Sequence, residues 1–236
     1  MDLPNLRREA RYGMPAADHI LYNRDYVLGY SYYFRQAKWA LEIVDHNADA
    51  ERADNFRPDY RLPESFRADL EDYHRSGYDR GHLAASANHR DNDLQNSETF
   101  LLSNMSPQHA DLNRRIWREL EEEVRNLNRK DSVLETYVIC GPIFYFDQPV
   151  KFIGQDTSNE VAIPVPNAYF KSVLTEDDKG KLHMWSFIFP NQRCDNPIKD
   201  YRVSTTKVEQ YAGIQLWSQI EGAKITTEKK RTRAMW

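Results

Sequence analysis

An amphipathic segment in the middle of the chain restricts the possible folds more than any other feature. Between residues 111 and 127, apolar side chains recur at three- and four-residue spacing, which is the period of an α-helix with one buried face. The stripe consists of Leu112, Ile116, Leu120, Val124 and Leu127. Asp111 is the predicted N-cap, because its carboxylate can accept hydrogen bonds from free backbone N–H groups. Such a stripe needs a partner surface, and we expect a β-sheet to provide it.

Segments rich in β-branched and aromatic residues supply the strands of that sheet. "DYVLGYSYYF" and "KWALEIVD" predict a hairpin with a turn near Arg35 and Gln36. Three later segments, "LETYVICGPIF", "EVAIPVPNAYFKSVL" and "LHMWSFIFP", are further strand candidates. Between the hairpin and residue 78 the chain is rich in charge and proline, which predicts a long irregular connection.

Two further elements complete the expected fold. A strand is predicted from Glu98 to about Ser103, ended by Pro107, and a short amphipathic helix is predicted near residues 206–210. Strands that surround a few helices without a βαβ rhythm indicate an α+β fold. We therefore expect a central, mainly antiparallel β-sheet flanked by helices.

Length and composition fit one globular domain. The 236 residues are 40% hydrophobic, with no internal repeat or linker, so residues 1–222 are predicted to form a single domain. Residues 223–236, "AKITTEKKRTRAMW", carry five Lys or Arg and one Glu, which predicts a basic, flexible C-terminal tail. No run approaches the roughly 18 apolar residues that cross a bilayer, so no membrane association is expected.

Charge and cysteine content exclude several functional classes. The net charge of −4 excludes a polybasic coat, so any contact with nucleic acid must use a local basic groove. Two cysteines, Cys140 and Cys194, are too few for a disulfide framework or a cysteine-rich zinc site. They form either one bridge or two buried thiols, and Cys140, inside an apolar strand, is predicted to be an inert thiol.

The stretch "YDRGHLAASANH" carries a candidate reactive group. His82 follows Arg80 and a glycine, which suggests a proton-transfer group held beside an anion. Asn113 lies in the first turn of the predicted helix, where it can present its carbonyl oxygen to a hard cation such as magnesium. Asn113, Trp117, Glu121 and Arg125 recur every four residues opposite the apolar stripe, and Glu121 and Arg125 are close enough to pair. Trp117 taken alone is predicted to be a packing residue.

These segments together resemble a known family, the DNA/RNA non-specific endonucleases with a ββα-metal finger, and in particular the endonuclease G type. The matching segments are "DRGHLAASANH", "FLLSNMSPQ" and "LNRRIWRELE". In that family a DRGH box is followed by an N-x-x-P-Q segment and then by an L-N-x-x-x-W-x-x-L-E helix. The likeness covers roughly residues 5–217 and implies a ββα-metal finger at the active site.

The resemblance implies a role for each matching residue. His82 would be the general base, and Asn113 would be the one direct protein ligand of a magnesium ion. Glu121 would hold water bound to that ion. Arg80 would contact the scissile region, and Arg125 would help with the phosphate.

Five further positions follow from the same resemblance. The upstream arginine that assists the transition state is either Arg52 or Arg57 in "ERADNFRPD", with Arg52 slightly favoured. Arg57 and Arg114 are predicted substrate-binding residues. Asp79 and Asn104 are predicted to support the finger.

The implied activity is magnesium-dependent hydrolysis of DNA and RNA to 5′-phosphate and 3′-hydroxyl ends, with manganese able to substitute. The resemblance also implies a homodimer. Because an unrestrained nuclease would harm its own cell, we expect a periplasmic, secreted or organellar location, with any targeting segment absent from this chain, or else an inhibitor protein.

Two alternatives remain open at this point. A zinc hydrolase would use four histidines, but none of their spacings matches the recognised helical zinc motif. These are His74, His82, His89 and His109. The second alternative is a catalytically silent, nucleic-acid-binding relative, which would have no need of His82, Asn113 and Glu121 together. His89 is predicted to be structural, and His74 and His109 stay unassigned.

Overall fold

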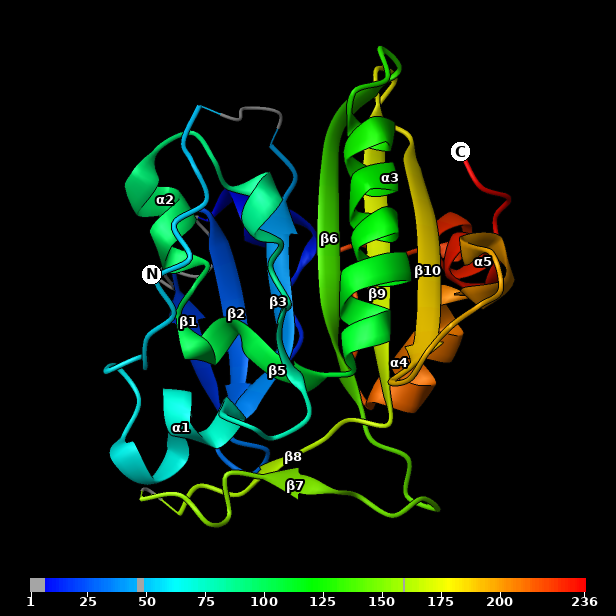
Figure 1. Cartoon of the computed structure of the whole chain (residues 1–236). Helices are drawn as coiled ribbons and strands as arrows, with labels where there is room; N and C mark the ends of the chain where they lie inside the picture. Colours follow the sequence, from blue (N-terminus) through cyan, green and yellow to red (C-terminus); the bar gives the residue numbers. More distant parts are fainter. Residues whose placement is uncertain (1–6, 46–48, 159) are drawn as a thin grey trace.

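A seven-stranded antiparallel sheet forms the centre of the computed structural model, which describes residues 7–45, 49–158 and 160–236 (Figure 1). The strand order is β1-β2-β3-β6-β9-β10-β11. Its strands are β1 (His19–Tyr22), β2 (Tyr26–Ser31), β3 (Gln36–Ile43), β6 (Val133–Ile143), β9 (Ala168–Asp177), β10 (Leu182–Pro190) and β11 (Arg202–Val203). Two small sheets pair β4 (Asp79–His82) with β5 (Met105–Gln108) and β7 (Phe152–Ile153) with β8 (Ile163–Pro164). The predicted α+β class with an antiparallel sheet is confirmed.

Helical elements are distributed around the sheet. The α-helices are α1 (Leu70–Tyr73), α2 (Asp93–Glu98), α3 (Arg118–Asn128), α4 (Thr205–Ala212) and α5 (Ala223–Lys230). The 3₁₀ turns are η2 (Arg8–Tyr12), η3 (Glu64–Phe66), η4 (Ser86–Asn88), η5 (Leu102–Asn104) and η7 (Ile198–Tyr201). None of the described helices combines the length and apolar character needed to cross a bilayer.

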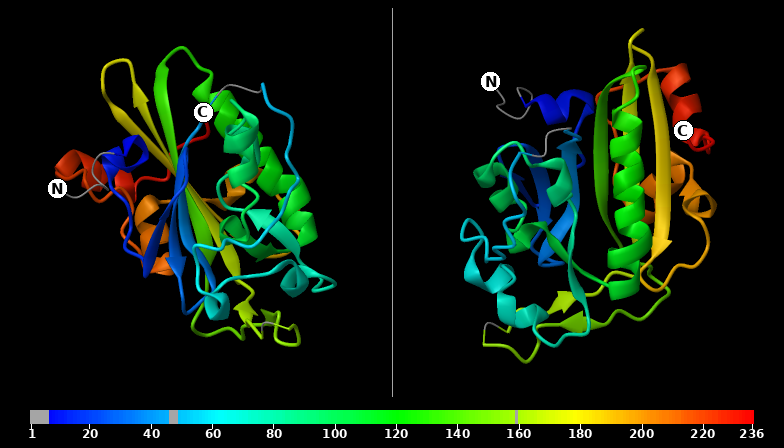
Figure 2. Two further views of the ribbon diagram at one scale, coloured as in Figure 1. Left: turned by 90° about the vertical axis from the view of Figure 1, so that its left-hand side faces the viewer. Right: turned by 45° about the horizontal axis from the view of Figure 1, so that its top comes forward.

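The sheet separates two hydrophobic cores. Figure 2 (left) shows it nearly edge-on, with α3 on one side and α4, α5 and the N-terminal turn on the other. On the α3 side, the predicted stripe is buried and packs against residues such as Val138 and Val173. On the opposite side, Trp39 and Trp217 are fully buried together with Val208 of α4. The sheet is therefore covered on both faces, which explains why its central strands are buried almost along their whole length.

The predicted hairpin forms between β2 and β3. Arg35 closes the turn with a positive φ of 53°. The pairing register shifts between Gly29 and Tyr30. A Cβ atom at Gly29 would lie 2.1 Å from the Trp39 ring, so only glycine fits there.

The helix after β5 begins with a wide turn. Leu112–Trp117 (η6) is π-helical and continues directly into α3. π-helical turns shift the register of side chains, and Trp117 is turned into the core with 1% exposure. The packing role predicted for Trp117 is confirmed, but its predicted place on the face opposite the apolar stripe is wrong.

The predicted N-cap at Asp111 is also wrong. Asp111 already has helical dihedral angles and makes no capping hydrogen bond. His109 provides the cap instead, because its Nδ1 accepts a hydrogen bond from the backbone N–H of Asp111 at 3.2 Å. The backbone N–H of Asn113 then donates to the carbonyl oxygen of His109 at 2.9 Å.

The strand predicted from Glu98 to Ser103 is wrong. Glu98 ends α2, the next residues make a turn and η5, and the strand β5 starts only at Met105. Pro107 lies within β5 opposite Arg80, where a two-stranded ribbon tolerates the missing N–H group. Similarly, the single strand expected over residues 160–174 is divided into β8 and β9 by Pro164 and Pro166. The other predicted strands, and the helix near residues 206–210, are confirmed.

The C-terminal segment contacts the body of the protein. The backbone N–H of Met184 donates to Glu228 at 3.1 Å, and the Trp185 indole donates to the carbonyl oxygen of Ala234 at 2.7 Å. Trp236 stacks edge-on to Trp185 at 5.3 Å between ring centroids and donates to the carbonyl oxygen of Glu123 at 3.1 Å. This arrangement differs from the flexible tail expected over residues 223–236. The charges of the segment suggested that it is solvated, but contacts of Trp185 and Trp236 hold it against the body of the protein.

Candidate active site

The DRGH box forms the first strand of a small ββα unit. Asp79, Arg80, Gly81 and His82 make up β4 and pair with β5, which leads into the helix that carries Asn113. Gly81 is opposite Ser106, and a Cβ atom there would lie 2.3 Å from the Gln108 carboxamide oxygen. The glycine of the motif is thus required by close packing inside the finger.

A cleft of about 460 Å³ lies beside this unit. Four of its lining side chains are arginines, and Asp79 is the one carboxylate among the described lining residues. The arginines are Arg52, Arg75, Arg80 and Arg114. Although the chain is acidic overall, this cleft has the local positive charge that binding to phosphates requires.

His82 lies between two aromatic rings and beside two guanidinium groups. Its ring centroid is 5.7 Å from that of Phe56 and 4.9 Å from that of Phe100. Arg80 lies 4.1 Å from the Phe56 centroid, and Arg52 lies 4.8 Å from the Phe100 centroid. Burial, followed by the charges of Arg52 and Arg80, lowers the pKa of His82 to about 3. The imidazole is therefore neutral throughout the neutral pH range.

One nitrogen of this ring is unpaired. Nε2 of His82 is enclosed by protein and has no hydrogen-bond partner in the described part of the chain. An enclosed polar atom without a partner costs stability, so its presence at this position requires an explanation.

The lowered pKa predicts how stability depends on pH. His82 binds a proton near pH 6.5 in the unfolded chain and near pH 3 in the folded one. Between these values the unfolded state holds the extra proton, so stability is lost as the pH falls. From pH 7.5 to pH 5, we expect the wild type to lose up to roughly 2 kcal/mol of unfolding free energy more than His82→Asn. Urea denaturation at both pH values measures this difference, and parallel losses would contradict it.

Asp79 fixes the orientation of Asn113. Its Oδ2 accepts a hydrogen bond from Nδ2 of Asn113 at 2.9 Å and another from Nε of Arg114 at 2.8 Å. Burial opposes the charge of Asp79, but the hydrogen bonds from Arg114 and Asn113 keep its pKa below the ordinary value. Since the amide nitrogen is bound to Asp79, the amide oxygen of Asn113 is left to act as an acceptor or metal ligand.

The upstream arginines occupy different places. Arg52 lines the cleft and donates to the Ser86 hydroxyl at 3.1 Å. Arg57 instead donates to the carbonyl oxygens of Asn55 and Ser97, and it is absent from the described lining residues. The geometry therefore favours Arg52 of the two predicted alternatives.

Asn104 ties the finger together from within. It is fully buried, and its side chain accepts from the N–H of Ala84 at 2.9 Å. Its Nδ2 donates to the carbonyl oxygens of Ala84 at 3.0 Å and Thr99 at 2.9 Å. These bonds hold the turn that follows His82, which is the kind of supporting position predicted for Asn104.

Glu121 and Arg125 lie further along the helix and do not line the described cleft. The predicted pair between them is replaced by other partners. Glu121 is 3.7 Å from Nζ of Lys171 on β9, and Arg125 donates to Oδ1 of Asn88 at 3.2 Å. The reason is that the helix directs the Glu121 side chain toward the sheet, where Lys171 is buried.

The remaining histidines have separate environments. His89 is 1% exposed and lies 2.8 Å from a carboxylate oxygen of Glu42, which confirms its structural role. His109 caps the helix, and His74 lines the cleft. Among the described residues, no three His, Cys, Asp or Glu side chains are grouped as a metal site would require. This arrangement gives the zinc alternative no support.

The two cysteines are both free. Burial raises the pKa of the Cys140 thiol to about 12, so it stays protonated and unreactive. This agrees with the inert thiol expected from the sequence.

Several site residues had no usable signal in the sequence. Phe56 and Phe100, which enclose His82, are ordinary aromatic residues in the sequence, far from the DRGH box. Lys171 is different, because it is a lone charge within the apolar run "NAYFKSVL". A lysine in such a run is a signal for a buried ion pair.

Comparison with known proteins agrees with this geometry. Residues 7–223 match the sequence model of the DNA/RNA non-specific endonuclease family. Mitochondrial endonuclease G of Caenorhabditis elegans is 32% identical over 240 residues, covering 96% of this chain and 77% of the relative. Human mitochondrial endonuclease G is 32% identical over 214 residues, covering 87% of this chain and 71% of the relative.

A solved structure shows the same fold. The crystal structure of the EndoG/EndoGI complex, which concerns the mechanism of EndoG inhibition, superposes with a TM-score of 0.83 at 34% identity. The match covers 94% of this chain and 95% of that chain. With its DRGH finger and basic cleft, the chain belongs to the DNA/RNA non-specific endonuclease family and is a hydrolase that acts on nucleic acids.

Proposed function

We propose that this nuclease uses magnesium to hydrolyse phosphodiester bonds within DNA and RNA strands and leaves 5′-phosphate and 3′-hydroxyl ends. One observation carries the proposal: a neutral imidazole and an oriented amide, whose oxygen is left as an acceptor, come from adjacent parts of one ββα unit. The imidazole is that of His82, and the amide is that of Asn113 held by Asp79.

His82 is the proposed general base. A phosphodiester repels hydroxide, so a water molecule must lose its proton as it attacks phosphorus. The neutral ring of His82, with guanidinium groups on both sides, can take that proton without first losing one of its own. Attack by water on phosphorus with departure of the 3′ oxygen gives the proposed ends.

Asn113 is the proposed ligand of the metal. Its amide oxygen is free because its amide nitrogen donates to Asp79. Hard divalent cations prefer oxygen ligands, and magnesium keeps much of its hydration shell, so one protein ligand with nearby phosphate suits it. When bound, the ion supplies positive charge for the developing negative charge on the phosphate and the leaving oxygen. Manganese accepts the same oxygen ligands and should substitute.

The remaining charges bind and hold the substrate. Arg52 and Arg80 lie beside His82, where they can meet the scissile phosphate, and Glu121 is proposed to hold a water of the ion's hydration shell. Arg125 is proposed to contact the phosphate chain. Arg57 and Arg114 are proposed to contact flanking phosphates. Contacts to phosphate carry no base sequence, and a water nucleophile needs no 2′-hydroxyl, so both DNA and RNA fit.

A digestion experiment tests this function. Single- and double-stranded DNA and RNA are incubated with magnesium, with manganese and with EDTA, and the product ends are analysed. We expect cleavage of all four substrates with either metal, none with EDTA, and 5′-phosphate ends. Binding without cleavage in every condition would support the catalytically silent alternative instead.

The names of the relatives support a proposal for the cellular location of this nuclease and for its inhibition by another protein. Two of the relatives compared above are named as mitochondrial, and the solved complex is named for the inhibition of EndoG. We infer an organellar location, or another compartment away from the chromosome, and restraint by an inhibitor protein.

A homodimer is proposed through an aromatic hollow. This hollow of about 850 Å³ is lined mainly by apolar side chains, with none of the cleft residues among them. Tyr33, Phe146 and Tyr211 line it and are all exposed, and an exposed aromatic patch of this kind is a feature of protein–protein contact sites. We expect the double variant Tyr33→Glu, Phe146→Glu to weaken dimerisation at least about tenfold in light scattering. A wild type that stays monomeric at high concentration would contradict the proposal.

A further inference from the structure

Lys171 is a charged residue in the interior of the molecule. It lies on β9 opposite Cys140 of β6, and it is 1% exposed. Its Nζ is 3.7 Å from Oε1 of Glu121 and 4.5 Å from the centroid of the Trp117 ring. Lysine is almost never buried this fully without a charged partner, so the ammonium requires an anion here.

Glu121 is the carboxylate that meets this ammonium. Its side chain is 14% exposed, and burial raises its pKa, while the charge of Lys171 favours the ionised form. Without the charge of Lys171, burial and the nearby negative charge of Glu42 would both favour the protonated form of the Glu121 carboxyl group. Lys171 therefore has a larger effect on Glu121 than any other single charge around it.

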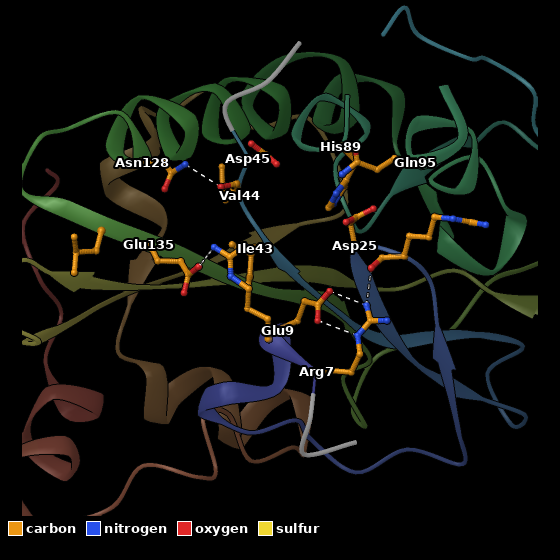
Figure 3. A pocket seen from close by; sticks show the side chains of 13 residues that line it. Arg7, Glu9, Asp25, Ile43, Val44, Asp45, His89, Gln95, Asn128 and Glu135 are labelled. Carbon is orange, nitrogen blue, oxygen red and sulfur yellow. Dashed lines mark hydrogen bonds and ion pairs between the residues drawn. The ribbon is translucent and has the colours of Figure 1, made fainter. Parts of the chain in front are cut away.

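The second carboxylate on this face, Glu42 of β3, already has partners. Its Oε2 lies 2.8 Å from Nε2 of His89 and accepts from the backbone N–H of Ala85 at 3.1 Å. His89 also lines a separate polar hollow, together with the ion pair between Arg7 and Glu9 (Figure 3). Oε2 of Glu42 is thus held by its own partners, and the ammonium of Lys171 forms its ion pair with Glu121.

The remaining titratable groups near Glu121 do not replace Lys171. Cys140 is a neutral thiol, because burial raises its pKa to about 12. Arg125, on the same helix, adds positive charge near Glu121, but its guanidinium donates to Asn88.

We propose that Lys171 is a positioning residue for the nuclease reaction: its buried ammonium keeps the Glu121 carboxylate ionised and fixed on the helix that also carries Asn113. The inference rests on the proposed function of Glu121 in holding a water of the metal's hydration shell. Lys171 is not among the described cleft residues, so it acts through Glu121 rather than on the substrate. A protonated or displaced carboxyl group would hold that water poorly.

Lys171→Met removes the charge and keeps most of the side-chain volume. We expect kcat at pH 7 to fall about 10–100-fold, the usual effect of losing an outer-shell partner, while KM changes less than about twofold. The acidic limb of the kcat profile should move to higher pH, with partial recovery of activity near pH 9. In a Glu121→Gln background, Lys171→Met should change kcat less than about threefold. Lys171→Arg should restore part of the activity.

A second measurement needs neither metal nor activity. Melting temperatures of the wild type, Lys171→Met, Glu121→Gln and the double variant are compared in EDTA. We expect the losses to be strongly non-additive, because each single change leaves the other charge buried without its partner. Lys229→Met is the matched control, since Lys229 pairs with Glu209 at 2.9 Å on the other side of the sheet. It should lower the melting temperature and leave the pH profile unchanged.

The outcomes separate this inference from the proposed function. If Lys171→Met lowered kcat by the same factor with and without Glu121, and left the pH profile in place, Lys171 would be structural only. Additive melting temperatures would overturn the pairing itself. If instead Glu121→Gln kept full activity while the coupling in EDTA remained, the proposed role of Glu121 would fail and the ion pair would stand.

Discussion

Replacing His82 with alanine should reduce kcat roughly 10³-fold, within the 10²–10⁴ range that general bases contribute. The reason is that the neutral imidazole of His82, beside the guanidinium groups of Arg52 and Arg80, is the proposed proton acceptor. His82→Asn, which keeps a planar polar side chain between Phe56 and Phe100, should lose activity to a similar degree. Steady-state kinetics on a labelled duplex, with saturating magnesium, measure the effect.

A remote histidine serves as the control. His183 is the second residue of β10, next to the turn that connects it to β9, and its Nε2 lies 3.1 Å from a carboxylate oxygen of Asp177. We expect His183→Ala to change kcat less than about twofold, as surface substitutions usually do. A His82→Ala protein that kept most of its activity, with an unchanged melting temperature, would exclude the proposed base.

Replacing Asn113 with alanine is the second change for which we expect a large loss of activity. It removes the proposed ligand and leaves the Asp79 carboxylate with its hydrogen bonds from Arg114. Outer-shell partners of metal ligands already contribute 10–100-fold, so loss of the ligand should cost about 100-fold or more in activity. Higher magnesium should recover part of it, and calorimetry with manganese should show weaker binding.

Asp79→Asn tests the orientation of the same amide. An asparagine at 79 has no negative charge and only one acceptor oxygen, so it cannot accept all three hydrogen bonds that the two oxygens of Asp79 receive from Asn113 and Arg114. The Asn113 amide is then held less firmly in its direction. We expect a loss of about 10–100-fold, smaller than that of Asn113→Ala. Asn126→Ala, 12 residues beyond Arg114 of the cleft on the same helix, is the matched control and should be close to wild type. Equal metal affinity in all four proteins would contradict the ligand assignment.

Much of the fold could be predicted from the sequence because its signals are local. The apolar stripe of the helix, the hairpin and the long strands all follow from side-chain periodicity and β-branched content. The errors lie where short-range patterns are ambiguous. Residues 98–103 have strand-like composition but are used for a helix end, a turn and η5, since Asn104 and Arg57 fix that backbone from elsewhere.

The candidate site divides in the same way. His82, Asn113 and Asp79 are predictable because the motif places them in one short ββα unit. The ion-pair partner of Glu121 could not be predicted, because Lys171 lies on a strand 50 residues later in the chain. The π-helical turn is equally hidden, since no residue in "LNRRIW" is distinctive of it, yet it turns Trp117 inward and changes which side chains share a face.

The central claim is that the His82 ring and an ion held by the Asn113 amide act on one phosphorus atom. A crystal structure of the His82→Ala protein with manganese and an uncleaved DNA duplex tests it most directly, because the anomalous signal locates the ion. We predict one manganese ion on the amide oxygen of Asn113, with the scissile phosphate between that ion and the space left by the imidazole. An ion bound away from Asn113, or a phosphate bound where residue 82 cannot reach it, would contradict the account.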